Sequence, residues 1–159
     1  MRQGTQSGQF MQIVIVLLLA SGVGLWIAIE KTMPASANGL KVEVGNLRSY
    51  VSEAERLIEQ AEAGKTTENF FRVEIEMLRE KIQDVGEGVG AEKPSPGLEE
   101  KLSTAHTLVR AGAESLGRLA SLFNEPQQMD GEKAKLEEVF QQAIALEKSL
   151  AQESEATGR

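Results

Sequence analysis

The chain has 159 residues, a formal net charge of -7 and no cysteine. This length is enough for one domain, and the lack of thiols excludes disulfides, thiolate metal sites and covalently attached haem. The acidic charge and the 4% of aromatic residues argue against nucleic-acid binding, because that function needs basic groups for phosphates and rings for bases. No nucleic acid is therefore expected among the partners.

An uncharged stretch near the N-terminus predicts a membrane helix. Residues 3–29 contain no charged side chain, and the apolar part of the stretch, 10–29, would span about 30 Å as a helix, which is the thickness of a bilayer core. We therefore expect residues 1–9 to form a short N-terminal tail, residues 10–29 a single-pass anchor and residues 30–39 a juxtamembrane linker.

Two other export patterns overlap this stretch. The sequence Ala35-Ser36-Ala37 resembles a signal-peptide cleavage site, so cleavage following Ala37 would give a secreted chain beginning at Asn38. The apolar run is longer than the usual core of a signal peptide, which favours the anchor over cleavage. A pilin-type leader would require a glutamate a few residues into the helix, and none precedes Glu30.

Small residues recur every four positions in the expected anchor, at Ala20, Gly24 and Ala28. They share one helix face, and such a ridge lets two membrane helices approach closely, so a homodimer is one expected arrangement. The short N-terminal tail favours a cytoplasmic N-terminus, which places the chain after Glu30 outside the cytoplasm. The expected location is a bacterial inner membrane with the C-terminal domain in the periplasm.

Four segments after the linker repeat apolar residues at intervals of three and four, the spacing of amphipathic helices. Glycine and proline interrupt this pattern and set the expected ends. The predicted helices cover residues 40–63, 67–86, 96–123 and 131–152.

Local residues support these boundaries. Gly64 is a natural helix stop, and Thr66 or Thr67 can cap the helix that follows. Ser95, which precedes a proline, is the expected N-cap of the third helix, and Asp130 is the expected cap of the fourth. The Gly/Pro-rich stretch 86–97 is interpreted as a flexible connection.

Each predicted helix has one apolar stripe that it cannot bury alone, and the connections are short enough to join antiparallel neighbours. The predicted fold is therefore all-α, with an N-terminal transmembrane helix followed by an antiparallel four-helix bundle over residues 40–152. A flexible tail is expected at 153–159. The alternative is two long helical hairpins whose core is completed by dimerisation.

Two glycine motifs are similar to nucleotide-binding loops but stand in the wrong context. The stretch Ala63–Thr67 lacks the glycine that a phosphate-binding loop carries five residues before Gly64, and it follows a helix where that loop follows a strand. Gly86, Gly88 and Gly90 likewise lack the preceding strand and the spacing of a dinucleotide fingerprint. Neither motif is expected to bind a nucleotide.

His106 is the only histidine in the chain. A di-iron site of helical bundles is excluded, because it needs two Glu-x-x-His motifs and Ser103 stands three residues before His106. The stretch Ala105–Leu122 resembles the phosphoacceptor helix of histidine phosphotransfer domains, which are four-helix bundles with the motif Ala-His-x-Leu-Lys-Gly. The resemblance implies His106 as the phosphoacceptor, although Val109 and Arg110 replace the lysine and glycine of that motif.

No catalytic set, cofactor site or metal site is recognisable in the sequence, because the acidic residues alternate with Lys and Arg at helical spacing, as on a solvated face. We therefore expect a non-enzymatic scaffold, assembly factor or accessory subunit of an envelope complex, with membrane lipid and envelope proteins as partners. One alternative is a ligand-sensing bundle that signals through a partner subunit. Another is a phosphotransfer module that uses His106.

Overall fold

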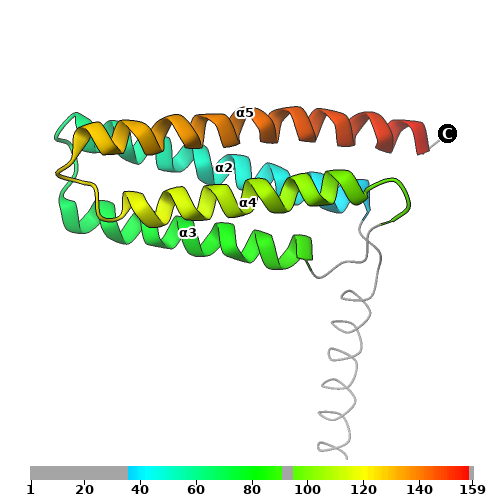
Figure 1. Cartoon of the computed structure of the whole chain (residues 1–159), viewed down its shortest axis with the longest axis horizontal. Helices are drawn as coiled ribbons and strands as arrows, with labels where there is room; N and C mark the ends of the chain where they lie inside the picture. Colours follow the sequence, from blue (N-terminus) through cyan, green and yellow to red (C-terminus); the bar gives the residue numbers. More distant parts are fainter. Residues whose placement is uncertain (1–35, 91–94, 158–159) are drawn as a thin grey trace, which may run out of the picture. The chain divides into compact units, whose positions relative to one another are not determined.

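The computed structural model describes residues 36–90 and 95–157, and this part of the chain forms four helices and no strand. The helices are α2 (Ala37–Glu62), α3 (Glu68–Gly90), α4 (Glu99–Leu119) and α5 (Pro126–Thr157). They run side by side in alternating directions (Figure 1). The predicted all-α four-helix bundle is confirmed, whereas the predicted anchor at 10–29 lies outside the described residues.

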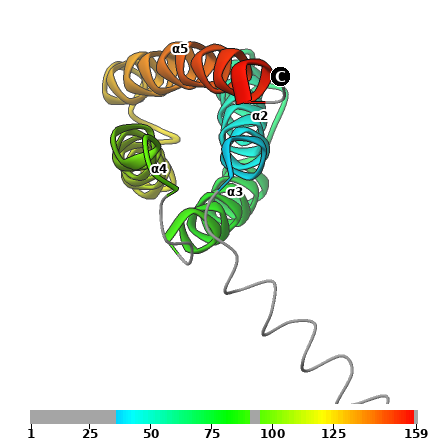
Figure 2. The same ribbon diagram turned by 90° about the vertical axis from the view of Figure 1, so that its right-hand side faces the viewer.

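The helices form a closed ring in chain order (Figure 2). Helices α2 and α4 lie diagonally opposite each other, and each packs against both α3 and α5. The ring closes between the first and last helices, where Ser154 Oγ donates a hydrogen bond to Asn38 Oδ1 at 2.9 Å. The core is thus enclosed by one chain, in contrast to the alternative of two hairpins that need a second copy.

The core is built from the apolar seams that the spacing predicts. Its largest fully buried side chains are Leu47, Ile58, Phe71, Ile75, Leu78, Ile82, Leu116, Leu119, Leu136 and Leu150. The rings of Phe71 and Phe123 pack with their centroids 5.5 Å apart. Burial of each large aliphatic side chain contributes roughly 1.5–3 kcal/mol, so these residues supply most of the driving force for the bundle.

Helix α2 begins before residue 40, where it was expected, because Ser36 caps it. The Ser36 Oγ accepts a hydrogen bond from the Gly39 backbone N–H at 3.0 Å, and such caps contribute about 1 kcal/mol. Ala37 is therefore the first residue of α2. The cleavage that the signal-peptide alternative requires would fall directly after this residue.

The turn between α2 and α3 follows the prediction. Gly64 has a φ of 65°, a conformation that glycine adopts without steric cost. The Lys65 N–H bonds to the Gln60 carbonyl at 2.8 Å across this turn, which is the pattern of a glycine C-cap. Thr67 Oγ1 then accepts a hydrogen bond from the Phe70 N–H at 3.3 Å and caps α3.

The start of α4 differs from the prediction that Ser95 and Pro96 begin it. The Leu98 N–H bonds to the Ser95 carbonyl at 3.0 Å, and Gly97 has a φ of 94°. A proline followed by a glycine with positive φ is typical of a type II turn, and this φ does not fit a helix. The helix therefore begins at Glu99, and the prediction of Ser95 as its N-cap was wrong.

Helix α5 also begins earlier than expected. Pro126 is its first residue, a position that suits proline because the first N–H of a helix has no partner inside the helix. The Glu125 carbonyl accepts from the Met129 N–H at 3.0 Å. Asp130 lies inside the helix and is not its cap, and α5 continues to Thr157, into the stretch expected to be a flexible tail.

Candidate functional site

A groove of about 1390 Å³ lies between α3 and α4. Its apolar lining is formed by Gly86, Leu102, Val109, Ala113 and Gly117. Its polar lining is formed by Arg79, Gln83, Glu87, Glu99, Ser103, His106, Thr107, Arg110 and Glu114. Both basic and acidic side chains line it, so the groove has no single charge preference.

His106 lies on α4 with its side chain exposed in this groove. A Cβ atom added to Gly90 of α3 would lie 3.3 Å from the imidazole Cε1, so a glycine on the facing helix leaves room beside the ring. Arg110 lines the groove one helical turn further along. The imidazole is thus open to a partner molecule, and its role as a phosphoacceptor stays a prediction.

Three glycines near the end of α3 do not form the flexible connection that the sequence suggested. Gly86, Gly88 and Gly90 are helical, and each lies close to a side chain of a neighbouring helix. A Cβ on Gly88 would lie 3.3 Å from the carboxyl group of Glu43 on α2, and a Cβ on Gly86 would lie 2.9 Å from Val109 Cγ1 on α4. The glycines serve close helix packing, and the interpretation of 86–90 as a connection was wrong.

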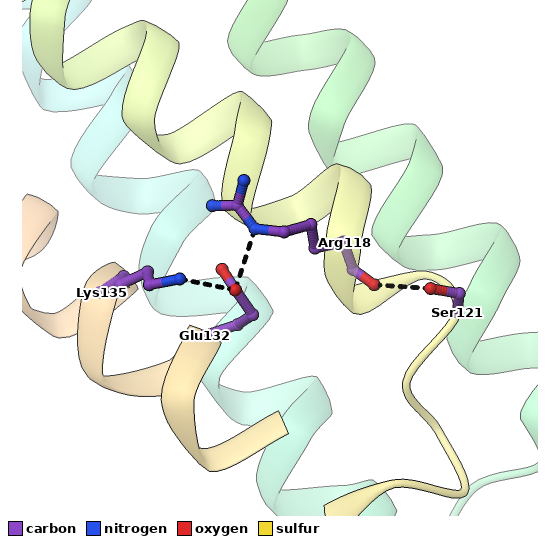
Figure 3. A network of polar contacts seen from close by, with 4 residues as sticks. All are labelled: Arg118, Ser121, Glu132 and Lys135. Atoms are coloured by element: carbon purple, nitrogen blue, oxygen red, sulfur yellow. Dashed lines mark hydrogen bonds and ion pairs between the residues drawn. The ribbon is translucent and has the colours of Figure 1, made fainter. Parts of the chain in front are cut away.

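Glu132 is a buried carboxylate between α4 and α5, with 6% of its surface exposed (Figure 3). Its Oε1 accepts from Arg118 Nε at 2.9 Å and from Lys135 Nζ at 2.7 Å. Burial opposes ionisation, but the bonds from Arg118, Lys135 and Ser115 outweigh it and hold the pKa of Glu132 below its ordinary value. The cluster thus joins α4 to α5 around one ionised group.

A second carboxyl group, Glu55 on α2, faces Glu137 on α5. Both line a hollow of about 310 Å³, and Glu55 Oε1 is buried with no hydrogen-bond donor in the described part of the chain. Burial and then the contact with Glu137 raise the pKa of Glu55 to about 7, against the opposing charge of Lys133. A proton shared by the two carboxyl groups would satisfy the buried oxygen.

The exterior of α3 carries an apolar stripe that the sequence analysis missed. Phe70, Val73 and Met77 are 50%, 55% and 38% exposed, and their spacing of three and four places them on one side of the helix. Among the described residues, the only other large exposed apolar side chain is Val42 on α2. We call these three residues the α3 stripe. An i, i+3, i+7 pattern outside the buried seam was the signal that could have revealed it.

The predicted helix–helix interface at Ala20, Gly24 and Ala28 lies outside the described residues. None of the helices in 36–90 and 95–157 is long and apolar enough to cross a membrane. In the same ranges, no group of three or more His, Asp or Glu side chains is arranged to hold a metal ion.

The chain was compared with protein-family models, with curated proteins and with solved structures. None of the three comparisons gave a match. Any statement about function therefore rests on the sequence and on the geometry described above.

Proposed function

We propose that the chain is a non-enzymatic accessory subunit or assembly factor of an envelope complex. In this proposal residues 10–29 anchor it in the inner membrane with the bundle in the periplasm. The single observation that carries the docking role is the α3 stripe, because isolated exposed apolar residues are common but a row on one helix face is typical of an interaction surface.

The cap of α2 supports retention of the anchor. Cleavage after Ala37 would separate Ser36 from the helix whose first turn it caps, and would leave a charged amine on Asn38 in its place. A positive charge at a helix N-terminus is unfavourable, because the helix dipole is positive there. The intact chain keeps both the cap and the apolar segment.

Site-directed crosslinking in native membranes tests the proposal. Because the chain has no native cysteine, only the introduced cysteine carries the crosslinker. Val73→Cys in the full chain would carry a photoreactive maleimide, and Val42→Cys, on an exposed valine of α2, is the matched control. We expect a discrete adduct with another envelope protein from position 73 and none from position 42. Equal labelling from both positions, or a mature N-terminus at Asn38 by mass spectrometry, would contradict the proposal.

A second candidate, phosphotransfer through His106, has its own supporting observation. The imidazole is exposed in the groove, and Arg79 and Arg110 line the same groove, where they could contact phosphoryl oxygens. This function would place the bundle in the cytoplasm. Incubation of the full chain with phosphoramidate should then give an acid-labile phosphate that His106→Gln abolishes, and absence of that phosphate would exclude the candidate.

A further inference from the structure

The α3 stripe ends beside a hollow that could receive a side chain. This hollow, of about 540 Å³, lies at the turn between α2 and α3 and is lined by Phe70 together with Gln60, Gly64, Lys65, Thr66 and Thr67. Exposed apolar side chains at i, i+3 and i+7 form the kind of helix face through which one amphipathic helix binds a partner.

Acidic groups continue the same face of α3. Glu80 follows Val73 by seven residues and Met77 by three, and Asp84 follows Met77 by seven, so both extend the line of the stripe. Neither carboxylate has a hydrogen bond or ion pair within residues 36–90 and 95–157. These two charges are therefore available to a partner.

Lys81, which follows Glu80 on α3, is directed toward α2. Lys81 Nζ lies 5.4 Å from the centroid of the Tyr50 ring on α2, a cation–π contact. Helix α3 as a whole has six acidic and three basic residues. The apolar stripe is thus continued by negative charge that its own helix does not neutralise.

The negative charge beside the stripe distinguishes two possible occupants, a second copy of the chain and a basic helix of another protein. A second copy of the chain would bring the same Glu80 and Asp84 to the contact, and like charges at close range oppose binding. A partner helix with Lys or Arg beside its apolar face would cover Phe70, Val73 and Met77 and would also pair with the two carboxylates. Charge complementarity therefore favours the basic partner.

We infer that the α3 stripe binds a basic amphipathic helix of a protein partner, with its apolar side chains on Phe70, Val73 and Met77 and its Lys or Arg side chains on Glu80 and Asp84. This inference rests on the docking role proposed above and adds the chemistry of the partner. The hollow at the α2–α3 turn lies beside the Phe70 end of this contact.

The test uses the full chain in native membranes with the photoreactive Val73→Cys variant. The crosslinked segment of the adduct is sequenced by mass spectrometry. We expect a segment with apolar residues at helical spacing and flanking Lys or Arg. A segment of this same chain, an acidic or uncharged segment, or a lipid adduct would overturn the inference. A segment of an envelope protein that lacks basic residues would leave the docking role intact, whereas no adduct above the Val42→Cys control would remove both.

A charge variant gives a second, independent readout. In the Val73→Cys background, Glu80→Gln with Asp84→Asn should lower the adduct yield about threefold or more, since two exposed ion pairs are lost. Glu100→Gln on α4 with Glu138→Gln on α5 changes the net charge equally and should leave the yield unchanged, because both side chains are exposed and α5 does not pack against α3. Added salt should reproduce the loss by screening. Equal effects of the two double variants would contradict specific pairing at α3.

Discussion

Gly86 on α3 and Val109 on α4 pack so closely that a Cβ atom on the glycine would lie 2.9 Å from Val109 Cγ1. Glycine in a helix interior costs about 1 kcal/mol relative to alanine. The close approach of the Val109 side chain to the α3 backbone explains why this position nevertheless holds glycine.

The first prediction follows from this contact. Gly86→Ala should destabilise the bundle by about 1 kcal/mol, because the stiff, β-branched Val109 cannot move aside cheaply and the clash exceeds the gain in helix propensity. Gly45→Ala on α2, where no atom lies within 4 Å of the added Cβ, should stabilise by up to about 1 kcal/mol. Urea unfolding of the full chain, followed by the helical circular dichroism signal, compares the two. Equal gains for both variants would show that the α3–α4 approach is not tight.

The second prediction concerns pH. Because the pKa of Glu55 is about 7 in the bundle and about 4.5 ordinarily, the folded state binds its proton more tightly than the unfolded state. The stability contributed by this proton is complete below about pH 4.5 and is lost as the pH rises through about 7.

Glu55→Gln should therefore raise stability at pH 8 on the order of 1 kcal/mol, since the amide can donate to Glu137 without ionising and solvent screens part of the effect. The difference from the native chain should vanish near pH 4. The measurement is the midpoint of thermal unfolding across this pH range, with the exposed Glu53→Gln as control. A pH-independent difference would contradict the proton-sharing pair.

The third prediction tests the buried carboxylate of Glu132. Arg118→Met removes one of its two cationic partners and should cost about 1–3 kcal/mol, because a buried charge is left poorly compensated. The double variant Arg118→Met with Glu132→Met should recover most of this loss, since apolar pairs often replace buried ion pairs without cost. Additive losses in a double-mutant cycle would show that the two residues do not interact.

The fourth prediction separates two leucines that the spacing treats alike. Leu116 is fully buried, whereas Leu102 is half-buried at the edge of the α3–α4 groove. Leu116→Asp should abolish the cooperative unfolding transition, because an unpaired charge cannot be buried without large cost. Leu102→Asp should leave a folded bundle with a lower midpoint. Loss of the fold in both variants would place Leu102 in the core.

The heptad spacing predicted the bundle and most of its core. Apolar residues at this spacing lie on one face of a helix, and that face is the one buried in the bundle. Local residue types predicted the turn at Gly64 and a cap at Thr66 or Thr67, of which Thr67 caps α3. Local chemistry alone determines the conformation there. The spacing did not predict Gly88 and Gly90 as helical residues. These glycines lie against Glu43 and His106, which are neighbours in space on other helices.

The candidate sites were harder to predict for the same reason. His106 was found because a single histidine is conspicuous, but the groove around it requires the pairing of α3 with α4. Glu132 and Glu55 are ordinary surface glutamates in the sequence, and only packing against α4 or α5 gives them shifted pKa values. The spacing of the α3 stripe could be read from the sequence. Its exposure could not be predicted, because the sequence does not show which apolar face of α3 packs into the core.

The hydrogen bond between Ser154 and Asn38 has a mechanical consequence. It holds the first turn of α2 beside the last turns of α5, so a load applied to the chain at these two points pulls across the seam between them. The contacts between α2 and α5 would then break one helical turn at a time, beginning at this bond. A load directed along the helices would instead have to shear many side-chain contacts together and would require a greater force.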